Sequence, residues 1–545
     1  LKTNTTADNN TAIGYYSLQA NTTGTENTAV GANALDANTT GAYNTAMSRD
    51  ALGKNTTGNY NVSLGHNTMA ENTTGSNNIA IGVNALDANT TADNNTAVGH
   101  IALSANTTGA TNVAMGYYAL TANTTGASNV AVGATALDAN TTASNNTAVG
   151  HASLGANTTG ASNTAVGSSA LAAHTTANYC SAFGADSLQT NTTGAANTGI
   201  GQGALNANTT ADNNTAVGYA ALNVNTTGDR NTAVGRSALV ANTTGAYNTS
   251  MGYDALGANT TAANNTAVGY TALSANTTGA TCVAVGTSAL LLNTTANNGT
   301  AVGYLALGAN TTGAGNTAVG TNALDANTTG ASNTSVGVHA GGAITTGSNN
   351  ICIGLSAGNH DGAIVTGGQN TMIGNYTDTN ATDADSVNTF GYNVTGEEGY
   401  TTLGVGTDDI RAAHGNVTWA TVSDERVKKD IEDSTVGLNF INDLRPRTFK
   451  YKAKGDIPEE FNGYEEGSTK AYKNSNTNHG FIAQEVKEVI DNHSDIVNGF
   501  RMWDVRESGQ QEVAEAALIP MLTKAVQELS AKVEELETKL NKQGE

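Results

Sequence analysis

The chain has 545 residues, yet its 63 Gly, 12% charged residues and 5% aromatic residues do not fit a row of globular domains. Its net charge of −22 argues against nucleic acid and anionic membranes as partners, because a polyanionic surface repels both. No apolar run approaches the ~20 residues that span a bilayer, so we predict no membrane insertion.

A repeat of 17 residues fills most of the chain. Its motif, Asn-Thr-Ala-Val-Gly-x-x-Ala-Leu-x-Ala-Asn-Thr-Thr-Gly/Ala-x-x, begins at Asn10 and recurs in constant phase as far as Asn350. We number its positions as columns 1 to 17. An unvarying period predicts a solenoid in which each repeat is one coil stacked on the last. We therefore expect a mainly β shaft over residues 1–345, since Gly, Thr and Asn in every turn disfavour helix.

Two large apolar columns are expected to form the core of the coil. Column 4 is always large and apolar, from Ile13 to Ile353, and column 9 is Leu or Met as far as Leu324. We expect both to point inward, because only stacking makes such a thin core continuous. Column 5 is Gly in every coil except at Ser48, as expected where a strand bends and a side chain would collide with the next coil.

The small and polar columns suggest how coils and chains are joined. Columns 3 and 8 are small, as at Ala29 and Ala34, and we expect them to allow close approach of a second chain. The Asn residues of column 12, such as Asn89, Asn106 and Asn123, are expected to form an amide ladder.

The segment Thr-Ala-Val-Gly-x-x-Ala-Leu resembles the head repeat of trimeric autotransporter adhesins, over residues 1 to about 360. The resemblance implies a left-handed parallel β-roll packed as a trimer.

Column 6 is the most variable column and, because it follows the Gly bend, we expect it to face solvent. It forms a candidate surface-contact stripe for a host cell-surface glycan or protein. The stripe comprises Tyr15, His66, His100, Tyr117, His151, Tyr219, Tyr253 and Tyr270. The alternative is that these are tolerant positions on a spacer rod. Two of its histidines, two coils or roughly 10 Å apart, are too distant to share a zinc ion, so we predict no metal and no cofactor.

The three cysteines, Cys180, Cys282 and Cys352, are expected to be buried free thiols. The repeat then decays, and we expect irregular final coils and loops over 346–399, followed by a β neck over 400–422.

Ser423 and Lys428 begin the C-terminal part, five residues apart. An alcohol needs a base to act as a nucleophile, and a lysine serves when burial favours its neutral form. Attack on the preceding carbonyl would cut the chain between Val422 and Ser423. The alternative is that Ser423 is a helix N-cap and the lysine is solvated.

Four motifs follow in order: Ser-Asp-Glu-Arg-Val-Lys-Lys-Asp-Ile, Leu-Arg-Pro-Arg-Thr-Phe-Lys-Tyr, His-Gly-Phe-Ile-Ala-Gln-Glu-Val and Ala-Leu-Ile-Pro-Met-Leu. The set resembles the self-cleaving intramolecular chaperone of phage tailspikes and tail fibres, the endosialidase type. The resemblance implies a small α+β domain, which we place at 423–515, that trimerises the fibre and then cuts itself off through a serine–lysine dyad. Those roles carry over to Ser423 and Lys428.

The last segment, 516–545, predicts a coiled-coil helix. Its apolar positions are Leu522, Val526, Leu529, Val533, Leu536 and Leu540. Val at a with Leu at d favours a dimer, whereas the resemblance implies a trimer.

The combined prediction is a phage tail fibre, made in the cytoplasm of the infected bacterium and built into the virion. We expect a homotrimer that contacts a host cell-surface glycan or protein and an upstream tail or baseplate component, with autoproteolysis as its only chemistry. One alternative is a bacterial trimeric surface adhesin. The other is a polysaccharide-degrading tailspike, which needs paired carboxylates. The column-10 acids of the shaft instead occur singly, at Asp36, Asp87, Asp138 and Asp325.

Overall fold

The computed structural model describes residues 2–361, 363–416, 419–420, 423, 425–461, 463–494, 496, 502–506 and 509–543. The chain divides into two compact units, Leu1–Val422 and Ser423–Glu545. Each unit is described by itself.

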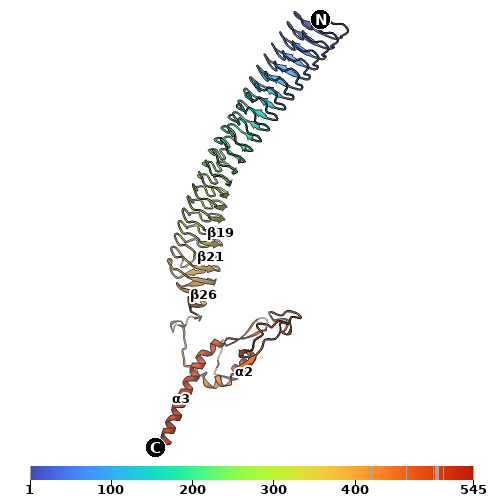
Figure 1. Ribbon diagram of the computed structural model, residues 1–545. Helices are drawn as coiled ribbons and strands as arrows, with labels where there is room; N and C mark the ends of the chain where they lie inside the picture. Colours follow the sequence, from blue (N-terminus) through green and yellow to red (C-terminus); the bar gives the residue numbers. More distant parts are fainter. Residues whose placement is uncertain are drawn as a thin grey trace. The chain divides into compact units, whose positions relative to one another are not determined.

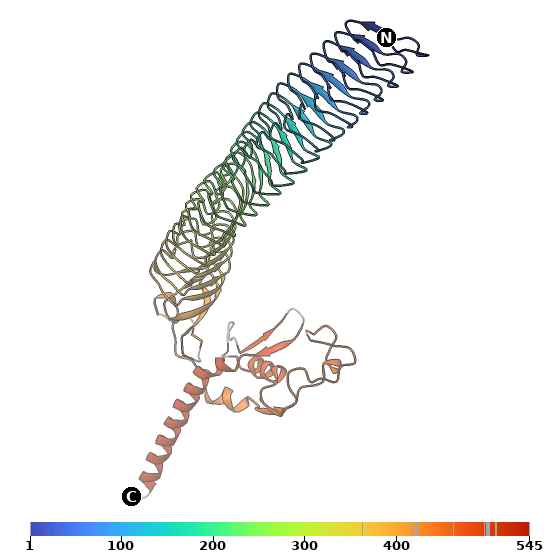
Figure 2. The same cartoon turned by 45° about the horizontal axis from the view of Figure 1, so that its top comes forward.

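The first unit is a stack of short parallel strands. From β1 (Thr11–Ile13) and β2 (Thr28–Val30) to β21 (Ile351–Ile353), every coil contributes one three-residue strand at columns 2 to 4. Each strand pairs with the next in parallel, column against column, as Thr11 with Thr28. The strands lie one above another along one side of the shaft (Figures 1 and 2). The predicted parallel β-solenoid of 17-residue coils is confirmed, with about 23 coils.

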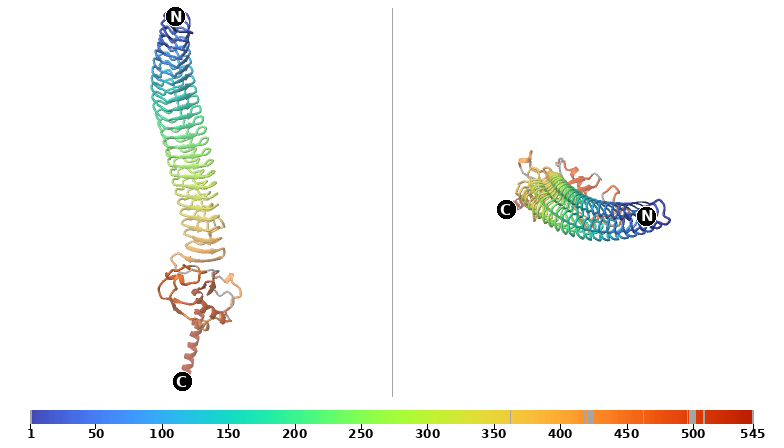
Figure 3. Two further views of the ribbon diagram at one scale, coloured as in Figure 1. Left: turned by 90° about the vertical axis from the view of Figure 1, so that its right-hand side faces the viewer. Right: turned by 90° about the horizontal axis from the view of Figure 1, so that it is seen from above.

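The stack continues beyond the point where the repeat decays. Strands β22 (Thr371–Ile373), β24 (Asn388–Tyr392) and β26 (Tyr400–Val405) extend the parallel sheet, and β27 (Asp408–Ala413) pairs antiparallel with β26. A short second ladder joins β23 (Asp378–Thr379) to β25 (Thr395–Gly396). Buried Ile344 and Ile364 occupy the interior where earlier coils place the column-12 Asn. Residues 346–399, expected to be irregular, therefore carry paired strands, and the coils stay in one continuous column (Figure 3).

Columns 3, 8 and 9 fill the interior of each coil. Ala29, Ala34 and Leu35 are completely buried, whereas Met47 and Phe183 of column 4 are 44% and 41% exposed. The expectation that column 4 points inward is therefore wrong, and so is the expectation that columns 3 and 8 face a second chain. In a three-residue strand the side chains alternate, so the middle residue points inward and its two neighbours point outward. The narrow coil takes alanine at that middle position.

Two ladders of buried asparagine join the coils. In column 12, Asn106 Nδ2 donates to Asn89 Oδ1 at 3.2 Å, which confirms the predicted amide ladder. Column 1 forms a second ladder, in which the backbone N–H of Asn112 donates to Asn95 Oδ1 at 2.9 Å. Both amide groups of one coil also donate to the same carbonyl, as Asn106 and Asn95 do to Gly109 O at 2.9 and 3.0 Å. The ladders thus satisfy polar groups that burial would otherwise penalise.

One coil carries a histidine in place of the column-12 asparagine. His174 is fully buried; its Nε2 lies 2.8 Å from Ala177 O, and its Nδ1 lies 3.0 Å from Asn191 Nδ2. Asn191 Nδ2 also donates to Gly194 O at 2.8 Å, which fixes it as a donor toward the ring. His174 Nδ1 must therefore accept, and the ring is neutral. Burial lowers the pKa of His174. The nearby Cys180 thiol, 3.9 Å from Asn191 Nδ2, adds no charge there.

We expect His174 to make the shaft acid-sensitive. Above its ordinary pKa of 6.5, the histidine is neutral in both folded and unfolded chains, and its contribution to stability is fully present. As pH falls below that value, the unfolded chain takes up a proton that the folded chain resists, so stability is lost. The melting temperatures of wild type and His174→Asn should diverge between pH 8 and pH 4.5, with the variant more stable in acid. An equal difference at both pH values would contradict this assignment.

The second unit combines small sheets with helices. Its helices are α1 (Leu438–Asp443), α2 (Ala483–Asn492) and α3 (Ile519–Gln543), with 3-10 turns η1 (Glu425–Val427), η2 (Lys454–Asp456) and η3 (Glu515–Leu518). Its two antiparallel pairs are β28 (Arg447–Phe449) with β29 (Asn478–Gly480), and β30 (Trp503–Val505) with β31 (Gln511–Val513). The core gathers Val436, Phe440, Leu444, Val486, Met502 and Leu518. Among the described residues, no helix combines the length and apolar character needed to cross a bilayer.

Candidate functional site

The candidate processing site lies at the first residue of the second unit. Lys428 Nζ donates a hydrogen bond of 2.7 Å to Ser423 Oγ. The turn η1 separates the two residues, and its Glu425 carbonyl accepts from the Lys428 N–H at 3.0 Å, so the backbone folds back and brings amine and hydroxyl together. Both side chains are exposed in the single chain. Val422, the other residue of the predicted cleavage bond, lies outside the described residues.

A salt bridge joins two of the sequence motifs beside this site in the chain. Arg447 of Leu-Arg-Pro-Arg-Thr-Phe, on β28, donates through Nε to Glu485 Oε2 at 2.8 Å and through Nη2 to Oε1 at 2.5 Å. Glu485 belongs to Gly-Phe-Ile-Ala-Gln-Glu and lies in the first turn of α2. The guanidinium holds the pKa of Glu485 below its usual range. Sequence reasoning gave these residues no role, although opposite charges in two adjacent motifs were a signal that they pair.

The terminal helix is tied to the same domain by a capping contact. Glu528 Oε2 of α3 accepts from the backbone N–H of Leu438 at 2.8 Å, at the start of α1. A carboxylate at a helix N-terminus satisfies a free donor and offsets the helix dipole. The predicted coiled-coil residues are exposed on α3, and their pairing with another chain stays a prediction. They are Leu522, Val526, Leu529, Val533, Leu536 and Leu540.

Column 6 lies at the surface of the shaft. Tyr15, Tyr117, Tyr219, Tyr253, Tyr270, His100 and His151 are exposed, and His66 is half-buried. Rings of successive coils stack on one another. The centroids of His100 and Tyr117 are 5.6 Å apart, and those of Tyr253 and Tyr270 are 5.3 Å apart. These stacked rings therefore present edges and polar atoms rather than free faces, and binding of a glycan or protein stays a prediction.

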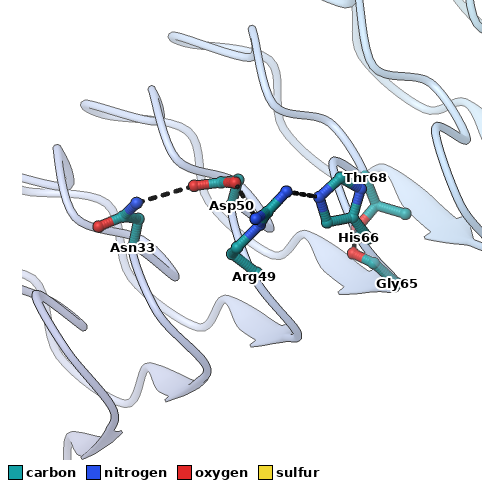
Figure 4. A network of polar contacts seen from close by, with 6 residues as sticks. All are labelled: Asn33, Arg49, Asp50, Gly65, His66 and Thr68. Atoms are coloured by element: carbon teal, nitrogen blue, oxygen red, sulfur yellow. Dashed lines mark hydrogen bonds and ion pairs between the residues drawn. The ribbon is translucent and has the colours of Figure 1, made fainter.

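A polar network crosses three coils at the N-terminal end of this stripe (Figure 4). Asn33 Nδ2 donates to Asp50 Oδ1 at 2.9 Å, and Arg49 Nε lies 3.1 Å from Asp50 Oδ2. Arg49 also donates to His66 Nε2, which must therefore be an acceptor on a neutral ring. These contacts tie neighbouring coils together at their edge.

The cysteines are buried free thiols, as predicted. Burial raises the pKa of Cys180 to about 11 and that of Cys352 to about 12, so neither is a thiolate at neutral pH. In the described part of the chain, no three His, Cys, Asp or Glu side chains gather as metal ligands would.

A solenoid of repeated coils followed by a small domain that opens on a paired hydroxyl and amine defines a fibrous protein with a C-terminal assembly domain. Residues 423–495 match the family described as chaperone of endosialidase. The chain thus carries an intramolecular chaperone domain of this family behind its β-solenoid, as in a tail-fibre or endosialidase-type protein. The match includes Ser423, Lys428, Arg447 and Glu485 and ends before α3. Comparisons with curated proteins and with solved structures found no match.

Proposed function

We propose that this chain is a phage tail fibre whose C-terminal domain brings three copies together and then cleaves itself from the shaft between Val422 and Ser423. The observation that carries the proposal is the 2.7 Å hydrogen bond from Lys428 Nζ to Ser423 Oγ at the first residue of the chaperone match. The shaft would reach from an upstream tail component to a glycan or protein on the host surface. The exposed column 6 is its candidate contact stripe.

The proposed cleavage is an acyl transfer within one chain. Lys428 Nζ takes the proton of Ser423 Oγ, which attacks the Val422 carbonyl carbon. The Val422–Ser423 C–N bond breaks, the leaving amine gains a proton, and an ester joins the Val422 carbonyl to Ser423 Oγ. Water then hydrolyses the ester, releasing a carboxylate at Val422 and a free hydroxyl and amine at Ser423.

The exposure of the dyad in a single chain couples cleavage to assembly. A lysine accepts a proton only in its neutral form, and burial favours that form. In the single chain both side chains are open to water. Contacts with neighbouring copies would bury the amine, so cleavage would follow trimerisation.

Wild-type protein should run on a denaturing gel as two fragments of about 422 and 123 residues. Ser423→Ala and Lys428→Ala should each leave a single full-length band, because one removes the nucleophile and the other the base. Lys429→Ala is the matched control, since it removes the adjacent lysine and should still cleave. Wild-type chains that trimerise and remain whole would refute the proposed activity.

A further inference from the structure

The outward face of the shaft sheet is apolar and continuous. In every strand from β1 to β22 the first and third residues point outward, and none of these strands contains a charged residue. Column 4 supplies a large apolar side chain in each coil, with Ile13 60%, Met115 43% and Ile353 37% exposed. The acidic residues of the shaft lie in other columns. A soluble single chain rarely exposes a contiguous apolar patch larger than a few hundred Å².

The spacing of this face selects its partner. Its side chains repeat once per coil, roughly every 4.8 Å, over a length on the order of 100 Å. A helix rises about 1.5 Å per residue and cannot place one apolar side chain opposite each coil along that length. A globular partner covers only a few coils. A second copy of this shaft, parallel and in register, has the same spacing and meets every coil with an apolar residue.

We propose that columns 2 and 4 of the sheet face form the contact between copies of the shaft. The proposal rests on the homotrimer of the proposed function and names the surface that the trimer buries. The exposed apolar residues of α3 support it, because the same chain leaves uncovered seams in the shaft and at its C-terminal end. With the C-termini held together, the copies must run parallel, and column 4 of each coil meets its counterpart.

Methionine oxidation tests this surface directly. Met47, Met115 and Met251 lie in column 4 and are 42–44% exposed in the single chain, whereas Met69 lies in column 9 and is fully buried. In the assembled protein, peroxide should oxidise all four at least tenfold more slowly than in the denatured chain. A trimer in which only Met69 is protected would overturn the proposed interface and leave the trimer intact. A monomeric protein would overturn both.

A pair of variants within one coil gives a second readout. Val132→Asp places a charge in column 4, one coil from Met115, while Thr142→Asp places the same charge at an exposed column-14 position of that coil. Both sites point outward, so each coil keeps its interior. Val132→Asp should speed oxidation of Met115 in the assembled protein severalfold, and Thr142→Asp should leave it unchanged. Equal oxidation of Met115 in the two variants would overturn the proposal.

Discussion

Removing residues 423–545 should yield shafts that aggregate or pair out of register instead of forming uniform trimers. The coils are nearly identical, so two shafts displaced by one coil lose contacts only at their ends, and many registers have nearly the same energy. Nothing in the repeat itself selects the correct register. A domain that holds the C-termini together fixes the register before the coils pair.

The deletion is best measured against a variant that keeps the domain. Ser423→Ala retains the whole chaperone and should form uniform trimers that stay uncleaved, whereas chains ending at residue 422 should elute as a broad, polydisperse mixture. Light scattering on the eluting species gives their mass. Uniform trimers from the truncated chains would show that the shaft aligns itself and would remove the need for a chaperone.

Gly116→Ala should destabilise the shaft strongly, by on the order of 3–5 kcal/mol. Gly116 has φ +142°, and a Cβ there would lie 2.4 Å from Gly133 O and 2.6 Å from Gly133 C in the next coil. Neither backbone atom can yield without opening the stack. Thermal unfolding of the variant should begin well below that of the wild type.

Two other substitutions separate this collision from a general effect of adding a methyl group. A Cβ at Gly53 would meet its nearest atom at 3.4 Å with no left-handed backbone, so Gly53→Ala should leave stability nearly unchanged. Ser48 holds the column-5 position at φ +120°, and Ser48→Gly should raise stability by about 1 kcal/mol by relieving that strain. If Gly116→Ala and Gly53→Ala melted alike, the close packing of column 5 would not explain its glycines.

The sequence predicted the period of the shaft but not the direction of its strand. Constant spacing identified the coils, the glycine bend and the column-12 ladder. The pattern Thr-Ala-Val alternates equally well with Val or Ala inside, and only the narrow width of the folded coil decides for Ala. The backbone of column 9 was equally hidden. Leu35, at φ +50°, adopts a left-handed conformation that leucine does not favour and that burial in the core maintains.

The processing site could be anticipated in part. The resemblance of the C-terminal motifs pointed to Ser423 and Lys428, and their five-residue spacing allows a short turn to join them. The pairing of Arg447 with Glu485 was missed, because residues 38 apart meet only when β28 and α2 pack together. Local patterns do not encode which charges will meet across two elements.

The most direct test of a temporary assembly domain is the mass of the native protein after expression of the full chain. Native mass spectrometry should find a complex of three chains ending at residue 422, together with free fragments that begin at Ser423. A single intact chain of 54.9 kDa as the only species would contradict the account.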